Sequence, residues 1–407
     1  MRVVVTSEAR FQRTPDGAVW TPDGPDHGFW TRYLSAFDEV RVAARTEQTD
    51  RVGELARRVD GPGVQVWPVP YYVGPRQYLA ARRAVAEAVG RAADDGDAVI
   101  LRVPSAIGSL LAARRGRRGL PYALEVVADP YDVFAPGTLD HPLRPLLRRR
   151  FAGRLRRQCA TAVAVSYVTE SYLQSRYPAA PGAPTTAASS IELPGSAFVP
   201  RPRTVTGPAA GQWTLVTVGT MDQLYKGVDT LIEAVARLAA GGLPVRLTHI
   251  GTGRFQPHLE ALARRHGVAD RVTFHGWCPP GEPLHRQLDA ADLFVMPSRT
   301  EGLPRALVEA MARALPALGT RVGGIPELLA PSDLVRPGDP VALATAVADL
   351  LADAARMTAA SARNLARARE FATTELTPRR TAFYQEVRRT MAQHGSRRDR
   401  AEPTLTG

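Results

Sequence analysis

The chain has 407 residues, 44% of them hydrophobic, which is enough for two or three domains, with two preferred, each with a core of its own. Its two cysteines, Cys159 and Cys278, lie far apart, which excludes a disulfide framework and a zinc ligand set and favours a reducing compartment. The formal net charge of +12 favours an anionic partner, such as a phosphorylated small molecule, an acidic membrane surface or nucleic acid.

Short β-branched runs alternate with longer amphipathic segments along the chain. The expected strands are 2–7, 39–45, 64–70, 98–104, 122–128 and 162–166 in the first half, and 214–220, 245–251, 271–277, 292–298 and 315–320 in the second. Helical patterns, such as 228–240 and 256–267, separate them. Nearly continuous apolar strands in alternation with helices predict an α/β protein whose parallel sheets are covered on both faces.

Residues 179–212 are rich in Pro, Gly, Ala and Thr, so we interpret them as the passage between two α/β domains. We expect an N-terminal domain at 1–190 and a C-terminal domain at 191–375. A last helix at 376–395 should pack back on the N-terminal domain, and 396–407 should form a disordered tail. No signal peptide is expected, because the apolar run at the start is too short. No transmembrane helix is expected, because the longest apolar stretch, near 98–113, is interrupted by Arg102 and Pro104.

The basic residues are concentrated at 111–120, 144–158 and 395–400. These runs have no interleaved aromatic residues and no zinc-finger spacing, so we expect no nucleic-acid partner. Residues 144–158 read either as a solvated helix with an apolar inner face or as a helix that lies on anionic lipid. We therefore expect a cytoplasmic protein and leave open a peripheral contact with the inner face of an anionic membrane.

Lys226 is the single lysine among the 52 basic residues. Because lysine is normally among the commonest residues, this composition indicates a coding bias towards arginine. A lysine that survives such a bias is a candidate functional residue, with chance survival as the alternative. Its compact charge on a slim stem suits a phosphate. Together with Gly227 it opens a predicted helix, where backbone amides also attract anions.

Two further loops follow strands and precede helices, which in a parallel sheet places them at the edge where ligands bind. In the first, Gly251 and Gly253 allow close approach of the backbone to a ligand, although a tight turn explains them equally well. In the second, Glu301 lies in a polar turn and Glu309 lies in the helix that follows. Eight helical steps leave roughly 80° between their directions, so the two carboxylates would contact different parts of one ligand. Carboxylates accept hydroxyl hydrogens, which suits sugar diols.

Several stretches together resemble a known family. "EGLPRALVE" (301–309) resembles the Glu-x7-Glu signature of the retaining glycosyltransferases of the GT4 family, which have the GT-B fold. "VGTMDQLYKGVDTLIEAV" (218–235) resembles the phosphate-binding strand–loop–helix of the same family, and "HIGTG", "VTFHGW" and "GGIPELL" match its order and spacing. The match is strong over 213–330. It implies two Rossmann-like, doubly wound parallel-sheet domains that face each other across a cleft.

The resemblance also implies roles for individual residues. Lys226 would bind the pyrophosphate of a nucleotide sugar, Glu301 the hydroxyls of the transferred sugar, and Glu309 the ribose diol. The implied set of donor-binding residues is completed by Gly219, Thr220, Gly251, Trp277, Gly302, Leu303 and Arg305. Such enzymes are usually metal-independent, so we expect no metal ion and no other cofactor.

Two positions depart from the family pattern. Thr220 stands where the family often has an arginine, so that phosphate contact would come from Arg299, Arg305 or Arg321, of which we favour Arg305.

The other departure is the loss of a histidine that the family tends to carry at the end of a first-domain strand. Asp129 is the nearest polar candidate for this catalytic position and Glu125 is the second. A turn role for Asp129 is equally expected, because Pro130 follows it. Residues 8–30 form a long loop in place of the family's short glycine loop.

We therefore expect a retaining, metal-independent glycosyltransferase. It would move a hexose or N-acetylhexosamine from a nucleotide sugar, UDP-linked by preference, to a hydroxyl of a glycan, a lipid-linked acceptor or a small metabolite. The alternative is a non-enzymatic basic protein that binds nucleic acid or anionic lipid. A dinucleotide-dependent oxidoreductase is disfavoured, because no Gly-x-Gly-x-x-Gly follows the first strand.

Overall fold

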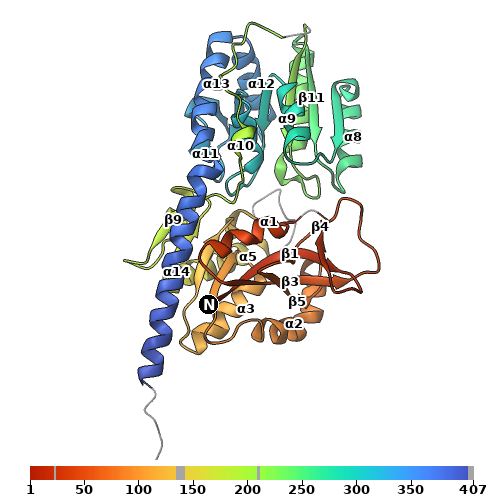
Figure 1. Ribbon diagram of the computed structural model, residues 1–407. Coiled ribbons are helices and arrows are strands. Elements are labelled where there is room, and N and C mark those ends of the chain that lie inside the picture. Colours follow the sequence, from red (N-terminus) through yellow and green to blue (C-terminus); the bar gives the residue numbers. More distant parts are fainter. Residues whose placement is uncertain (23, 134–142, 209–210, 402–407) are drawn as a thin grey trace, which may run out of the picture.

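Two parallel sheets organise the chain, one in each half (Figure 1). A computed structural model describes residues 1–401 except residue 23 and segments 134–142 and 209–210. The strands of the first sheet are β1 (Arg2–Arg13), β2 (Val19–Thr21), β3 (Glu39–Gln48), β4 (Arg57–Arg58), β5 (Val64–Pro70), β6 (Ala98–Val103), β7 (Ala123–Val126), β8 (Val165–Tyr167) and β9 (Thr185–Ala187). The second sheet contains β10 (Trp213–Val218), β11 (Val245–Ile250), β12 (Val272–Gly276), β13 (Leu293–Met296), β14 (Ala317–Thr320) and β15 (Leu334–Val335).

Helices separate the strands in both halves. Those of the first half are α1 (His27–Trp30), η1 (Thr31–Ser35), α2 (Gly74–Gly90), α3 (Ala106–Arg117), α4 (Pro130–Val133), α5 (Arg144–Thr161), α6 (Tyr172–Arg176) and η2 (Gly195–Ala197). Those of the second half are η3 (Leu224–Lys226), α7 (Val228–Ala240), α8 (Gln256–Arg265), η4 (Ala269–Arg271), α9 (Glu282–Asp289), α10 (Arg305–Ala312), α11 (Ile325–Leu328), η5 (Pro331–Asp333), α12 (Pro340–Leu351), α13 (Ala354–Arg369) and α14 (Thr373–Ala401). The α/β architecture expected from the sequence is confirmed.

Both sheets reverse their strand order at their first strand. In the first sheet β1 pairs in parallel with β3 on one side and with β6 on the other. In the second sheet β10 pairs in parallel with β11 on one side and with β13 on the other. Ligands of doubly wound sheets bind outside the carboxyl ends of the strands at such a switch point. This places the candidate sites in the loops that follow β10, β11 and β13.

The expected long loop over residues 8–30 is largely wrong. Strand β1 continues to Arg13, where it turns back into the antiparallel strand β2. Helix α1 follows, and its Trp30 is fully buried in the core of the first half. The extension was missed because the continuous apolar run ends at Val5. Residues 8–12 then alternate between polar and apolar, and backbone pairing with β3 continues to Arg13.

One apolar cluster joins the two halves of the molecule. It contains Val103 and Val126 from the first sheet and Leu303 and Leu307 from the second half. The two sheets therefore meet through packed side chains as well as through the connecting chain.

Helix α14 starts beside the second half and runs along the first, as the blue helix of Figure 1. It begins at Thr373 and continues to Ala401, so residues 396–401 are helical where a disordered tail was expected. Residues 402–407 lie outside the described part of the chain. Side chains Phe383, Tyr384 and Val387 pack into the core of the first half. Among the described residues, no helix combines the length and the apolar character needed to cross a membrane.

Candidate active site

Lys226 ends helix η3 at the carboxyl edge of the second sheet, directly before helix α7. Gly227, the residue between the two helices, has a left-handed φ of 71°. A Cβ at this position would lie 2.0 Å from the carbonyl oxygen of Pro297. Glycine is therefore required here, because it allows the loop that carries Lys226 to pack against the loop that follows β13.

Lys226 and Glu301 form an ion pair. The Nζ of Lys226 lies 2.6 Å from Oε1 of Glu301, and the two side chains are 18% and 8% exposed. Ser298 donates a second hydrogen bond, from its Oγ to the same Oε1 at 2.7 Å. Burial lowers the pKa of Lys226, but Glu301 and Tyr225 together outweigh burial, so the pKa is raised and the ammonium is retained. The structure thus brings together two residues that lie 75 positions apart in the sequence.

Two glycine loops pack against each other beside Lys226. The Lys226 side chain packs on Gly219. A Cβ added at Gly219 would lie 3.2 Å from the Cγ of Lys226. A Cβ on Gly251 would lie 2.0 Å from the carbonyl oxygen of Gly219, and one on Gly253 would lie 2.2 Å from the carbonyl carbon of Met221. These glycines therefore allow close approach of neighbouring backbone. This agrees with the tight-turn alternative that the sequence left open.

His249 is fully buried in β11 below these loops. Burial lowers its pKa to about 4, against a smaller opposing effect of the Gly219 backbone. Neither ring nitrogen forms a hydrogen bond of normal geometry with a described residue. The imidazole is therefore neutral at pH 7 and adds no charge beneath the loops.

Glu309 lies on helix α10, half-buried, and its side chain forms no hydrogen bond or ion pair with any described residue. Burial raises its pKa, while Arg305 opposes this shift. Arg305 also acts on the pKa of Lys226, which it lowers. The three side chains therefore share one electrostatic environment. A carboxylate that is half-buried and unpartnered within the described chain is suited to a ligand that supplies hydroxyl donors.

The three arginines proposed to replace the missing phosphate contact have different partners. Arg299 forms an ion pair with Asp229 at 2.8 Å. Arg321 donates to the carbonyl of Pro331 at 3.0 Å. Arg305 is exposed and forms no hydrogen bond or ion pair with the rest of the described chain. Of the three, Arg305 alone has a guanidinium without a described partner, which supports the choice made from the sequence.

Thr220, in the position of the family arginine, holds the first loop together. Its Oγ1 donates to the carbonyl of Thr252 at 3.3 Å and accepts from the amide of Asp222 at 3.1 Å.

Trp277 follows β12 and is 44% exposed, which is unusual for a tryptophan. An exposed indole at the carboxyl edge of the sheet is available for stacking.

The loop that contains Gly302 and Leu303 contacts the first half of the molecule. A Cβ on Gly302 would lie 2.5 Å from the carbonyl oxygen of Val127, at the end of β7. The Gly324 amide donates to the Gly302 carbonyl at 2.7 Å and so fixes the loop from the other side. Backbone from both halves therefore meets at this loop, next to Glu301.

The catalytic role considered for Asp129 does not fit its surroundings. Its side chain is 0% exposed and forms an ion pair with Arg176, Nε to Oδ2, at 3.0 Å. Tyr177 donates to Oδ1 and Tyr172 to Oδ2, and the Tyr131 amide also donates to Oδ1. These contacts occupy both carboxylate oxygens away from the Lys226–Glu301 pair. Asp129 is thus an anchor in the start of helix α4, as its alternative turn role implied.

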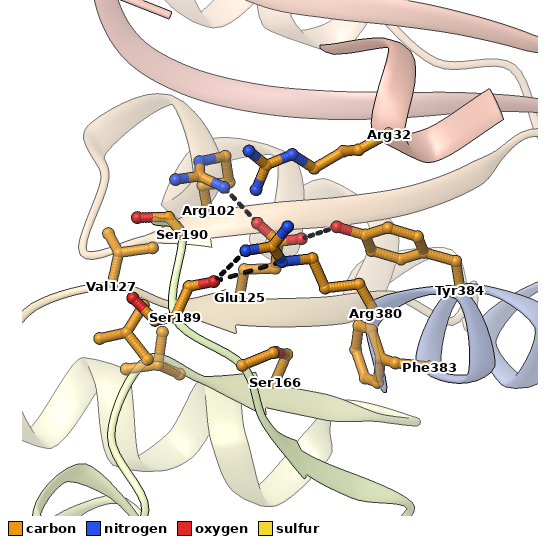
Figure 2. A pocket seen from close by; sticks show the side chains of 13 residues that line it. Arg32, Arg102, Glu125, Val127, Ser166, Ser189, Ser190, Arg380, Phe383 and Tyr384 are labelled. Atoms are coloured by element: carbon orange, nitrogen blue, oxygen red, sulfur yellow. Dashed lines mark hydrogen bonds and ion pairs between the residues drawn. The ribbon is translucent and has the colours of Figure 1, made fainter. Parts of the chain in front are cut away.

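Glu125, the second candidate, lies in a buried polar cluster (Figure 2). It forms an ion pair with Arg102 and accepts from Tyr33 and Tyr384, each at 3.0 Å. The cavity in this cluster has a volume of about 10 Å³, enough for one water molecule. It is too small for a nucleotide sugar, and Lys226 does not line it.

Three residues near the site were not found from the sequence. Ser298 holds Glu301, and Arg254 lies in the second glycine loop, where its Nε donates to the Asp222 carbonyl at 2.8 Å. Glu327, on helix α11, accepts from the amides of Glu170 and Tyr172 at 2.6 and 2.7 Å. Ser298 ends the predicted strand 292–298 and Arg254 follows the predicted strand 245–251, which was a usable signal. No signal in the sequence indicated that Glu327 would contact the other half of the molecule.

Comparison with known families bears directly on this arrangement. Residues 212–353, which contain the Lys226–Glu301 pair and Glu309, match the family described as Glycosyl transferases group 1. The chain therefore contains a glycosyl transferases group 1 domain. The resemblance to a glycosyltransferase family that the sequence motifs indicated is thereby confirmed at the level of group 1.

Three curated relatives are similar to all or part of this chain. Protein CapJ of Staphylococcus aureus is 26% identical over 79% of this chain and 79% of its own length. The putative colanic acid biosynthesis glycosyltransferase WcaL of Escherichia coli is 34% identical over 35% of this chain and 36% of its own. A GDP-mannose-dependent phosphatidylinositol monomannoside mannosyltransferase of Mycolicibacterium smegmatis is 37% identical over 33% and 37%. The chain thus spans about a third of the length of the second and third of these relatives.

Solved structures agree on the fold over the whole chain. Sucrose-phosphate synthase from Thermosynechococcus elongatus superposes with a TM-score of 0.67 at 16% identity, over 99% of this chain and all of that one. Anabaena HepE in complex with UDP superposes with a TM-score of 0.60 at 16% identity, over 97% of this chain and all of that one. At this identity the likeness shows the fold alone, and that fold is GT-B. The alternative of a non-enzymatic basic protein finds no support in these comparisons.

Proposed function

We propose that this glycosyltransferase transfers a hexose or N-acetylhexosamine from a nucleotide sugar to a hydroxyl group with retention of configuration. Lys226 and Arg305 bind the diphosphate of the donor. Glu301 accepts hydroxyls of the transferred sugar, and Glu309 accepts the ribose diol. Trp277 borders the base.

The ion pair between Lys226 and Glu301 is the observation that carries this proposal. Without a donor, the ammonium is neutralised by the carboxylate at 2.6 Å. A bound diphosphate offers Lys226 a stronger anion, and sugar hydroxyls offer Glu301 new donors. During reaction the ammonium and Arg305 stabilise the charge that develops on the departing diphosphate, without a required metal ion.

The group deprotonating the acceptor need not come from the protein. Asp129 is committed to Arg176 and the tyrosines, so we assign it no proton transfer. In same-face attack the leaving phosphate itself takes the acceptor proton. Closure of the two halves around the loop at Gly302 would exclude water and protect the donor from hydrolysis.

A UDP sugar is the first candidate donor, in keeping with the UDP bound by a structural neighbour, HepE. GDP-mannose is the second, because the mannosyltransferase named above uses it and is 37% identical over 145 residues. The acceptor is a glycan, a lipid-linked acceptor or a small metabolite. We further propose a cytoplasmic location, with a peripheral membrane contact where the acceptor is lipid-linked.

A thermal-shift panel with UDP, GDP, ADP and TDP sugars, without added metal, tests the proposal. A donor that binds the folded protein raises its melting temperature by mass action. We expect one nucleotide class to give a clear rise, and the Lys226→Ala protein to lose most of it, because the diphosphate loses a direct charge partner. A full shift in Lys226→Ala would show that the assigned role is wrong.

Removing Lys226 also leaves Glu301 without its cation, so a matched control is needed. The double variant Lys226→Ala/Glu301→Gln removes both members of the pair and leaves no buried unpaired charge. Without donor, its melting temperature should be close to that of the wild type. Added donor should still give no rise in this temperature. Arg321→Ala removes an arginine held by a carbonyl outside the site, and it should keep the full shift.

A further inference from the structure

A second cavity, of about 320 Å³, lies in the first half of the molecule beside helices α4, α5 and α6. The described residues that line it are Tyr131, Arg149, Ala152, Arg156, Arg176 and Tyr177. Three of these six carry a guanidinium and, within this described lining, none is acidic. The volume falls within the range of small-molecule sites, unlike the cavity of Figure 2.

Two of the three arginines have donors to spare. Arg149 is exposed and forms no hydrogen bond or ion pair with any described residue. Arg156 is also exposed, and in the described chain it donates a single hydrogen bond, from Nε to the carbonyl of Arg176 at 2.9 Å. Each guanidinium carries five N–H groups, so most of these donors face solvent or a ligand. Guanidinium groups that line one cavity suit a phosphate, because each of them can donate two parallel hydrogen bonds to phosphate oxygens.

Arg176, the third arginine of the cavity, is held by an ion pair and a hydrogen bond. Arg176 pairs with the buried Asp129 at 3.0 Å and donates from Nη1 to Tyr172 at 2.6 Å. Asp129 is fully buried, and its one charge balances only Arg176. The positive charge of Arg149 and Arg156 is therefore uncompensated by the described lining.

A short backbone segment connects the cavity to the loop that follows Glu301. Asp129, which anchors Arg176 and Tyr177, follows Val127 by two residues, and Val127 is the backbone that contacts Gly302. A ligand in this cavity would therefore lie on the first-domain side of the loop that carries Glu301. That is the position from which an acceptor would approach the sugar.

We propose that this cavity binds a phosphate or diphosphate group of the acceptor. The inference rests on the proposed function and narrows its acceptor to a phosphorylated one. A free sugar phosphate and a lipid-linked diphosphate present the same group, and the binding test separates these two sources.

The test compares two double variants of helix α5. Arg149→Ala/Arg156→Ala removes two arginines that line the cavity, and Arg150→Ala/Arg157→Ala removes two exposed ones that do not. Both pairs are seven residues apart on one helix and remove the same charge, so non-specific electrostatic effects are matched. Glucose 6-phosphate and geranyl diphosphate are titrated calorimetrically at fixed ionic strength, with glucose as the neutral comparison.

We expect wild type and the Arg150/Arg157 variant to bind a phosphorylated probe more tightly than glucose, and the Arg149/Arg156 variant to bind it at least tenfold more weakly. The probe that binds more tightly identifies a soluble or a lipid-linked acceptor. Equal weakening in both variants, or wild-type binding no tighter than glucose, overturns the assignment.

The donor thermal shift is measured on the same three proteins and separates the two proposals. All three should keep it, because helix α5 carries none of the donor contacts. A missing shift in the wild type rejects the proposed function, whatever the phosphate result. An intact shift without selective loss of phosphate binding rejects the cavity assignment alone.

Discussion

At the scale of single residues, Glu309 links the electrostatics of the site to a measurable pH dependence. Burial raises its pKa above the ordinary value, and Arg305 only partly opposes this. The ionised form accepts two ribose hydroxyls, whereas the protonated form loses an acceptor and gains a competing donor. Donor affinity should therefore be constant at high pH and fall as the pH drops through the raised pKa, at a higher pH than an ordinary carboxylate would give.

Glu309→Gln should bind the donor about tenfold more weakly, which corresponds to roughly 1.4 kcal/mol, and lose this pH dependence. Titrations of the donor between pH 4.5 and 8 measure both effects. Glu260→Gln, on helix α8, is the control, since its carboxylate accepts from Gln256 instead. An unchanged pH profile in Glu309→Gln would remove Glu309 from the donor site.

At the scale of elements, helix α11 contacts helix α6 across the two halves of the molecule. The Glu327 carboxylate accepts from three successive amides, those of residues 170–172, and from the Ser171 hydroxyl. Arg367 reinforces the contact through an ion pair with Glu170 at 2.7 Å. Glu327→Gln loses the negative charge that these donors face, so the free energy of unfolding should fall by about 1–3 kcal/mol.

Small-angle scattering measures the consequence for domain arrangement. Glu327→Gln should show a larger radius of gyration than wild type in the absence of donor, because a contact that holds the halves together is weakened. Glu375→Gln removes an exposed carboxylate of helix α14 and should change neither quantity. Identical scattering of wild type and Glu327→Gln would contradict the proposed contribution of this contact.

At the scale of the whole molecule, helix α14 holds the segment that connects the two halves against the first half. Arg380 is buried, and its guanidinium donates to the carbonyl of Ser189 (Figure 2). It also donates to the carbonyl of Ile191 and pairs with Glu192 at 2.8 Å. Burial lowers its pKa. Arg380→Met removes the donor to the two backbone carbonyls, while Glu192 keeps its ion pair with Arg32 at 2.6 Å. The free energy of unfolding should therefore fall by about 2–4 kcal/mol.

Arg379→Met is the matched control for this prediction, because the neighbouring arginine is exposed and bonds to no other described residue. Denaturant unfolding of the two variants should differ by most of the expected loss. Equal stability would mean that helix α14 contributes through its apolar face alone.

The sequence by itself determined the α/β architecture and the three loops at the carboxyl edge of the second sheet. Strand and helix periodicity and the spacing of Gly219, Lys226, Glu301 and Glu309 are local properties, so they can be read without a structure. Strand β15 was missed because it has only two residues and is defined by its pairing with β14, and the extension of β1 was missed because the continuous apolar run ends at Val5.

Only the tertiary structure decided which polar residues are occupied and which are available. Asp129 and Arg305 are both charged residues after predicted strands, yet the first is enclosed by Arg176 and two tyrosines and the second is exposed. The cavity at Arg149 and Arg156, and the contact of Glu327 with helix α6, likewise join segments that are distant in the chain. Burial and pairing arise from such long-range contacts, which no local pattern encodes.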